Sequence, residues 1–186
     1  MDLGLKDRVA AVAAASSGLG RATARALADE GAKVAICGRH RETIEAAARS
    51  IAGDTGSDVE PIVADVSSGD DCRRFVSATV ERFGRLDILV TNSGGPRPGT
   101  FEQTADEEWD AGFRVTLASI VHLARAAALE MARRSWGRIV NIASLSARQP
   151  VDGLVLSNTF RPAVVGLAKT LSLELAGDGI LVNLIK

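Results

Sequence analysis

The chain has 186 residues, of which 46% are hydrophobic and 24% are charged, and its formal net charge is −1. This length and composition predict one globular domain with a hydrophobic core. Such a small net charge gives no electrostatic reason to expect nucleic acid or an anionic membrane as a partner. The two cysteines and two histidines cannot form a metal-ligand cluster by spacing, and no uninterrupted apolar run approaches the ~18 residues of a membrane span. We therefore expect no metal, a cytoplasmic location, and reduced, buried thiols at Cys37 and Cys72.

Short apolar runs alternate with longer helical patterns from one end of the chain to the other. Strands are predicted at 8–14, 33–37, 59–64, 86–90, 137–143 and 179–185, and helices at 18–31, 41–53, 69–83, 104–134 and 158–176, the first two ended by Gly31 and Gly53. The strands are apolar throughout rather than alternating, which indicates burial on both faces. The pattern predicts a single α/β domain over residues 1–186, a doubly wound parallel sheet in three α/β/α layers.

The first strand-to-helix turn, AAASSGLGRAT (13–23), is a candidate phosphate-binding loop. Glycines there let the backbone approach a pyrophosphate, and the free N–H groups of the following helix bind it. The strict G-x-G-x-x-G pattern is not met, because Thr23 stands at the third glycine position, and a simple tight turn is the alternative. The position after the first strand favours a nucleotide site, with Ala14, Ser16, Ser17, Gly18, Leu19 and Gly20 as candidate cofactor-binding residues.

The end of the second strand, AICGRH (35–40), bears on the choice of nucleotide. A carboxylate at this point binds the ribose 2′-OH of NAD, whereas an arginine accommodates the 2′-phosphate of NADP. Gly38 stands where the carboxylate would be and Arg39 follows it. A solvated arginine is the alternative, but the sequence favours NADP over NAD.

Four blocks in order resemble the short-chain dehydrogenase/reductase family. VAAASSGLG (12–20) is similar to its T-G-x-x-x-G-x-G loop, with alanines at 13 and 14 in place of the threonine and first glycine, and ADV (64–66) to the segment whose aspartate contacts adenine. LVTNSGG (89–95) resembles its N-N-A-G motif with two substitutions, and GRIVNIAS (137–144) the strand that ends in the catalytic serine. The resemblance implies a Rossmann fold and cofactor contacts from Asp65, Val66, Asn92, Ser93 and Gly94.

The family transfers hydride between a nicotinamide and a carbonyl or alcohol carbon with an Asn-Ser-Tyr-Lys set. In this chain the serine is Ser144, but the tyrosine position holds Ser157, the lysine position Arg161 and the asparagine position Thr116. No tyrosine occurs anywhere in the sequence. The resemblance therefore implies an active site in which three of the four residues are replaced.

The replacements change the acid–base chemistry that is available. A phenol can be tuned towards neutrality, whereas a serine hydroxyl is too weak an acid and a guanidinium does not release its proton. Arg161 could stabilise an alkoxide, with Ser144 as a second donor and water as the proton source, or it could simply bind the nicotinamide ribose or a phosphate. Pro162 predicts that the helix begins near 158–161 or is distorted there, so Ser157 is either an N-cap or a catalytic or binding residue.

TNSGGPRPG (91–99) and GLVLSNTFR (153–161) also resemble a divergent, 3-oxoacyl-(acyl-carrier-protein) reductase-like branch of the family that lacks the tyrosine. Arg97, in the first of these segments, could grip an acidic substrate group or be merely solvated. The favoured hypothesis is an NADP(H)-dependent oxidoreductase acting on a small-molecule carbonyl or alcohol, with a 3-oxoacyl thioester as one candidate. A catalytically silent nucleotide-binding sensor or scaffold is the alternative, and a third hypothesis is that Ala14 closes the phosphate loop so that nothing binds.

Two expectations concern the whole molecule. Helix 104–134 contains TLASIVHLARAAALEM (116–131), which is apolar around most of its circumference, so one face should pack on the sheet and another on a second copy in a homodimer or homotetramer. GILVNLIK (179–186) resembles the family's sixth strand, after which ordinary members continue with a substrate lid, a helix and a final strand. We expect residues 1–186 to be part of a longer chain, with that C-terminal part missing and an exposed edge strand left behind.

Overall fold

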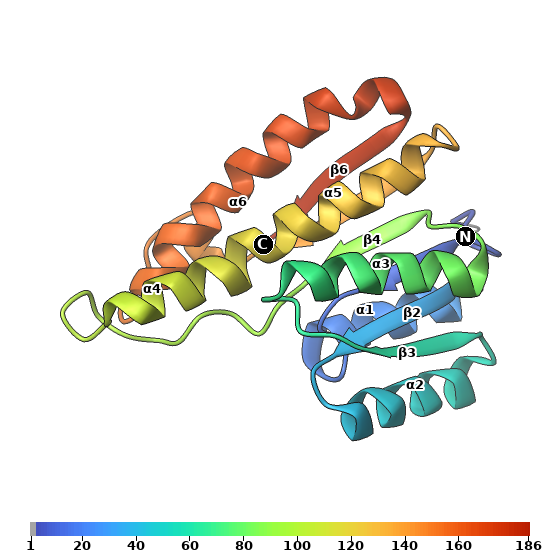
Figure 1. The fold of residues 1–186 in the computed structure, drawn as a ribbon, viewed down its shortest axis with the longest axis horizontal. Helices are drawn as coiled ribbons and strands as arrows, with labels where there is room; N and C mark the ends of the chain where they lie inside the picture. The colour runs from blue at the N-terminus through green and yellow to red at the C-terminus, as the bar shows by residue number, and fades with distance from the viewer. Residues whose placement is uncertain (1–2) are drawn as a thin grey trace.

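The computed structural model describes residues 3–186, which form a six-stranded parallel sheet flanked by helices (Figure 1). The strands are β1 (Val9–Val12), β2 (Lys33–Gly38), β3 (Val59–Val63), β4 (Ile88–Thr91), β5 (Gly137–Ile142) and β6 (Ile180–Ile185). Their order in the sheet is β3-β2-β1-β4-β5-β6, so the chain reverses its direction of winding between β1 and β4. Ligands of such sheets bind at this switch point, beyond the carboxyl ends of the strands.

Helices cover both faces of the sheet. They are α1 (Gly18–Asp29), α2 (Arg41–Thr55), α3 (Gly69–Phe83), α4 (Asp106–Phe113), α5 (Ser119–Ala132) and α6 (Val155–Glu174). One buried cluster joins α1 and α2 to one face of the sheet, and a second joins α3, α5 and α6 to the other, which lies towards the viewer in Figure 1. The predicted doubly wound, three-layer α/β/α domain is confirmed.

Two helix boundaries differ from the sequence prediction. α2 continues through Gly53 and ends at Gly56, which has the left-handed φ of +72° that suits a glycine after a helix. The helix predicted at 104–134 is interrupted by a π-helical turn, η1 (Arg114–Ala118), between α4 and α5. π-Helical turns are rare overall, and those that occur are often found at functional sites.

The start of α6 is a further correction. The helix begins at Val155 with Leu154 as its N-cap, so Pro162 lies inside the helix and Ser157 is not a cap. Tertiary contacts hold the turn that precedes the proline: the Asn158 side chain exchanges hydrogen bonds of 3.0 and 2.8 Å with the backbone of Val151. These contacts outweigh the local tendency of a proline to begin a helix.

β6 lies at the edge of the sheet and, among residues 3–186, pairs only with β5. Its side chains alternate, so that Ile180 and Val182 are buried, whereas Leu181 and Ile185 are 49% and 58% exposed. The expected exposed edge strand with an apolar flank is therefore present. β6 and α6, the helix that carries Ser157 and Arg161, lie at the same edge of the sheet.

The helical run Asp106–Ala132 is long and apolar enough, by length and composition alone, to span a membrane, although the sequence suggested no such run. Of the relevant window, 44% is buried inside the molecule, and core helices of soluble proteins pass the same test. In α5, Leu123, Ala127 and Met131 are fully buried against the sheet. The finding is therefore weak evidence for a membrane span.

Candidate functional site

A cleft of about 460 Å³ opens at the carboxyl ends of β1, β2 and β4. Of the predicted cofactor-binding residues, its walls include Ala14, Ser16, Ser17, Gly18, Leu19, Arg39, Asp65, Val66, Asn92, Ser93 and Gly94. The sequence reasoning did not assign Gly38, Ala64, Gly95 and Val115, which also line it. Three of these four adjoin predicted residues in the chain, a signal that could have found them, whereas Val115 is brought there by the π-helical turn.

Gly20 does not line the cleft, but its lack of a side chain leaves room for a hydrogen bond between two of the cleft's walls. A Cβ at this position would lie 2.6 Å from the Ala14 carbonyl oxygen and 2.8 Å from Asn92 Nδ2. These two groups form a hydrogen bond of 3.1 Å that ties the loop after β1 to the loop after β4. Only a glycine leaves room for this bond.

Ala14 adopts φ = +47°, in the left-handed region that favours glycine. A Cβ in this region costs about 1–2 kcal/mol. The loop is held in place by bonds from Ala13 N–H to the Val90 carbonyl (3.0 Å) and from Ala15 N–H to the Cys37 carbonyl (2.9 Å). The cleft stays open with Ala14 in its wall, which argues against the hypothesis that this alanine closes the loop.

The first turn of α1 points its backbone N–H groups towards the same cleft. The N-cap Ser17 makes no side-chain hydrogen bond to them, and this turn contains no acidic residue. The positive end of the helix dipole is therefore not neutralised by the chain itself, which suits a phosphate group. The residues present thus fit the pyrophosphate of a dinucleotide.

Arg39 follows the last residue of β2 and is exposed at the mouth of the cleft. Among residues 3–186 it makes no ion pair and no side-chain hydrogen bond, unlike Arg41, which pairs with Glu45 at 3.1 Å. Its guanidinium is therefore free to meet an anionic group at the end of β2.

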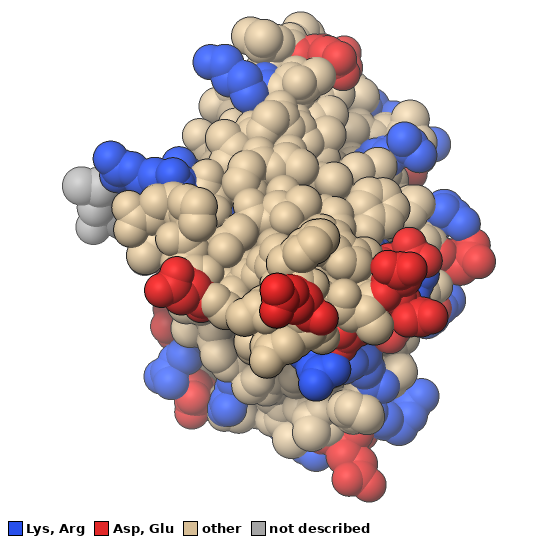
Figure 2. Space-filling view, turned by 90° about the vertical axis from the view of Figure 1, so that its left-hand side faces the viewer, with Lys and Arg blue, Asp and Glu red and all other residues tan. Residues whose placement is uncertain are grey.

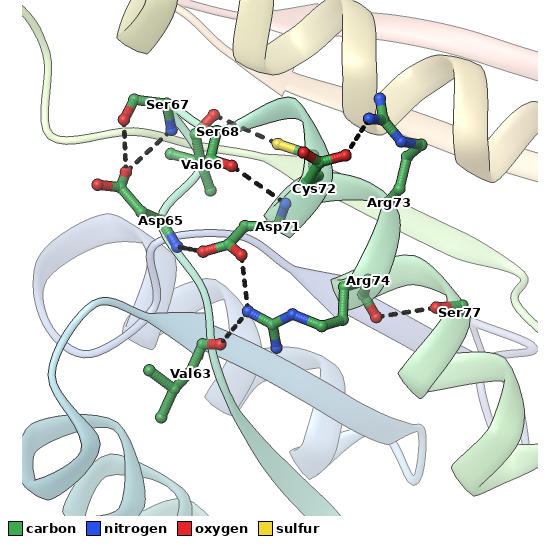
Figure 3. A network of polar contacts seen from close by, with 11 residues as sticks. Val63, Asp65, Val66, Ser67, Ser68, Asp71, Cys72, Arg73, Arg74 and Ser77 are labelled. Atoms are coloured by element: carbon green, nitrogen blue, oxygen red, sulfur yellow. Dashed lines mark hydrogen bonds and ion pairs between the residues drawn. The ribbon is translucent and has the colours of Figure 1, made fainter.

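A network of polar contacts fixes the loop after β3 (Figure 3). The Asp65 N–H donates to the Asp71 carboxylate at 2.8 Å, and Arg74 donates to the same carboxylate at 2.8 Å and to the Val63 carbonyl at 2.9 Å. The bond from Asp65, followed by that from Arg74, holds the pKa of Asp71 below its usual value. The Asp65 carboxylate in turn accepts from the Ser67 N–H and hydroxyl. Asp65 and Val66 are thus held in the wall of the cleft.

The three candidate catalytic residues lie together beyond the end of β5. The Ser157 and Ser146 hydroxyl oxygens are 2.8 Å apart, and Ser146 donates to the Ser144 hydroxyl at 3.1 Å. Ser146, which the sequence reasoning missed, belongs to the short 3₁₀ helix η2 (Leu145–Ala147) and is almost fully buried. Its only sequence signal is that it lies two residues after Ser144. The result is a continuous chain of three hydroxyl groups.

Arg161 lies one helical turn after Ser157, on the same face of α6. Only 7% of the residue is exposed, and its Nη1 donates to the Ile142 carbonyl at 3.0 Å. Its Nε is buried without an acceptor, and no carboxylate of residues 3–186 pairs with the guanidinium. Burial lowers the pKa of Arg161.

Thr116 and Arg97, two further residues that the sequence analysis considered, have different surroundings. Thr116 lies in η1, is fully buried, and its hydroxyl has no partner within residues 3–186. The turn packs against α6, the helix that carries Arg161. Arg97 forms an ion pair with Glu108 and is otherwise exposed.

Cys37 and Cys72 are free and buried, as expected. Burial raises the pKa of Cys37 to about 12 and that of Cys72 to about 11, so neither is a reactive thiolate near neutral pH. Within residues 3–186 there is no group of three or more His, Cys, Asp or Glu side chains that could hold a metal ion.

Figure 2 shows the molecule from the left-hand side of Figure 1, the side on which the carboxyl ends of the strands lie. A broad area without charged side chains lies above its centre, and Lys, Arg, Asp and Glu gather around the margin and below. On α4 and α6, Trp109 and Phe160 make an edge-to-face contact, and Phe101 and Phe113 flank the pair at ring distances of 6.3 and 6.1 Å. The four aromatic rings thus form a cluster beside α6, the helix that carries Ser157 and Arg161.

A doubly wound sheet is typical of a dinucleotide-binding domain when its switch point carries a glycine-containing turn and a helix N-terminus without a side-chain cap. The chain belongs to the short-chain dehydrogenase/reductase family, because the family model for short chain dehydrogenase matches residues 8–186. A protein of Streptomyces violaceoruber described as a ketoacyl reductase of the granaticin polyketide synthase is 39% identical over 177 residues, which are 94% of this chain and 65% of that protein. The chain therefore spans about two thirds of this relative's length.

Solved structures show the same fold. L-Sorbose reductase from Gluconobacter frateurii, in complex with NADPH and L-sorbose, superimposes with a TM-score of 0.97 at 33% identity, over 100% of this chain and 71% of that one. An NAD⁺-bound xylitol dehydrogenase superimposes with a TM-score of 0.93 at 27% identity, over 98% and 70% of the two chains. Both nicotinamide cofactors thus occur among similar structures.

Proposed function

We propose that this protein is an NADP(H)-dependent oxidoreductase that reduces a small-molecule carbonyl or oxidises the corresponding alcohol. The observation that carries this proposal is the free, exposed Arg39 at the end of β2, next to an open cleft with an uncapped helix N-terminus. The similarity to a protein described as a ketoacyl reductase makes a 3-oxoacyl thioester one candidate substrate. We propose a cytoplasmic location for it.

The residues present fit the cofactor. The turn 14–20 and the N-terminus of α1 would hold the pyrophosphate, Arg39 the 2′-phosphate, and the loop from Asp65 the adenine. When bound, NADPH would supply a hydride to the carbonyl carbon, and the resulting alkoxide would take up one proton.

The chain's own groups would act on the carbonyl oxygen. The Ser144 hydroxyl donates a hydrogen bond to it, and the positive charge of Arg161 stabilises the developing alkoxide. The hydroxyl chain Ser144–Ser146–Ser157, with contacts of 3.1 and 2.8 Å, would hold the Ser144 hydroxyl in place for this contact. Because no phenol is present, water is the ultimate proton source.

The alternative function is a nucleotide-binding sensor or scaffold that does not catalyse. The observation in its favour is the loss of the tyrosine and of the lysine, whose position holds Arg161 with its Nε lacking an acceptor. Both functions require cofactor binding. Consumption of NADPH with a panel of ketones, aldehydes and 3-oxoacyl thioesters separates them, because only the enzyme turns over.

The first test concerns cofactor choice. NADPH is expected to raise the melting temperature more than NADH does, because Arg39 forms charge-assisted hydrogen bonds with the 2′-phosphate. Arg39→Asp should abolish or reverse this preference, since the carboxylate repels the phosphate and accepts from a ribose hydroxyl. Arg41→Asp, at an arginine that already pairs with Glu45, serves as the control. Equal shifts with both cofactors in the unmodified protein would refute the NADP assignment.

We also propose that the protein assembles through α5 and α6. An apolar groove of about 410 Å³ runs between the two helices, lined by Val121, Ala128, Leu129, Leu167, Leu171 and Leu175. Leu129 is 67% exposed at its rim although the opposite face of α5 is buried against the sheet. A second copy that covers this groove would remove the apolar area from water.

Leu129→Glu is therefore expected to convert a dimer or tetramer into a monomer, because the substitution places a charge in an apolar interface. Leu173→Glu is the matched control: Leu173 is 71% exposed on α6 but does not line the groove. Light scattering at micromolar concentration reads out the mass of each variant. A monomeric unmodified protein would contradict the proposal.

A further inference from the structure

The guanidinium of Arg161 is an unusual buried charge. Arg161 is only 7% exposed, and no carboxylate of residues 3–186 lies within ion-pair distance of it. Removing a charge from water without a counter-charge is costly, and proteins normally place a partner beside it. Arg8 and Arg85, at the opposite end of the sheet, follow that rule and share the buried Asp87. Arg161 is thus an uncompensated cation within a described structure that otherwise pairs its buried charges.

The side chain of Arg161 makes one hydrogen bond within residues 3–186, and this bond leaves one edge of the guanidinium without an acceptor. Nη1 donates to the Ile142 carbonyl at 3.0 Å, whereas Nε is buried without an acceptor and Nη2 makes no hydrogen bond within residues 3–186. Nε and Nη2 form one edge of the planar guanidinium, and their two N–H bonds are parallel. This edge matches the two oxygens of a carboxylate.

The free edge lies next to the candidate reaction site. Nη2 would be 3.9 Å from a Cβ built on Gly95, and Gly95 lines the cofactor cleft. Nη1 is bound to Ile142, two residues before Ser144, at the end of the strand that leads to the hydroxyl chain. An anion bound by Nη2 would therefore lie beside the Gly95 wall of the cofactor cleft.

We propose that Arg161 is a carboxylate-binding subsite and that the substrate is a carbonyl compound with a carboxylate close to its carbonyl group. This inference rests on the proposed function for the identity of the reacting group, but not for the binding of the anion. In this arrangement the carboxylate accepts from Nε–H and Nη2–H, so that Arg161 pairs with the carboxylate rather than with the developing alkoxide, and the neighbouring carbonyl oxygen accepts from Ser144. A 3-oxoacyl thioester is neutral at the corresponding position and would leave the charge unpaired.

The test uses a non-reacting pair of probes, oxamate and its neutral methyl ester, titrated calorimetrically into the full chain with and without saturating NADP⁺. Oxamate is expected to bind at least about tenfold more tightly than methyl oxamate, the ratio that a bidentate charge-assisted pair supplies. Arg161→Met should reduce this ratio to about one. Arg97→Met, which removes an exposed arginine paired with Glu108, should leave the ratio unchanged.

A second variant keeps the test decisive if Arg161→Met does not fold. Arg161→Lys retains the charge but lacks the planar edge, so it should lose most of the preference for oxamate while still binding NADP⁺. Equal affinities for oxamate and methyl oxamate in the unmodified protein would overturn the proposal. So would a preference that survives in Arg161→Lys and disappears in Arg97→Met. Oxamate selectivity without any binding of NADP⁺ would support the subsite while refuting the proposed function.

Discussion

Gly20→Ala is expected to abolish the stabilisation of the protein by NADPH. The new methyl group would lie 2.6 Å from the Ala14 carbonyl oxygen and 2.8 Å from Asn92 Nδ2. Both are parts of the cleft, and the 3.1 Å bond between them would have to open. Because one of the clashing atoms belongs to the backbone, the strain cannot be relieved by a change of rotamer. We expect a loss of about 1–3 kcal/mol in the free energy of unfolding.

Gly53→Ala is the matched control for this experiment. Gly53 lies inside α2 and does not line the cleft, and a Cβ added to it would meet no heavy atom within 4 Å. Alanine there should stabilise the protein by about 0.5–1 kcal/mol, as for other glycines in helices. Thermal denaturation with and without NADPH measures both effects. A Gly20→Ala protein that retains the full NADPH shift would contradict the role given to this glycine.

The sheet and most of the cleft could be predicted because their signals are local. Each segment predicted to bind a cofactor follows an apolar strand directly, so that Ser16, Arg39, Asp65 and Asn92 come to the same edge once the strands are parallel. The identity of the strands therefore fixes the position of these residues. The left-handed conformation of Ala14 could likewise be anticipated, because the family pattern has a glycine there.

The surroundings of the candidate catalytic residues could not be predicted, because they depend on side-chain contacts between a loop and a helix that follow no helix or strand periodicity. α6 begins before Pro162 because Asn158 binds Val151, a contact that no local pattern announces. Ser146 bridges Ser144 and Ser157 only because η2 packs against α6. The uncompensated charge of Arg161 is likewise a property of the packed structure. Substitutions in the sequence revealed an altered site, but not what the altered residues contact.

Ser144→Ala separates an enzyme from a silent nucleotide-binding protein. Ser144 is the one member of the family's catalytic set that this chain retains, and it ends the hydroxyl chain. Removing a hydrogen-bond donor to a developing oxyanion lowers the turnover rate by about 10²–10³-fold. We expect a decrease of this size in NADPH consumption with a carbonyl substrate, and no change in the NADPH-induced thermal shift, because Ser144 does not line the cofactor cleft.

Ser77→Ala, on the exposed side of α3, is the control for the loss of a hydroxyl. The structural role of Ser144 is small, since its hydroxyl accepts only weak bonds of 3.3 and 3.1 Å from Ser146 at the start of η2. A large fall in melting temperature is therefore not expected, and the rate reports on chemistry. If the unmodified protein consumes NADPH and Ser144→Ala consumes it equally fast, the serine does not polarise the carbonyl and the proposed mechanism is wrong. If NADPH binds but no carbonyl compound is reduced, the protein is a nucleotide-binding sensor or scaffold.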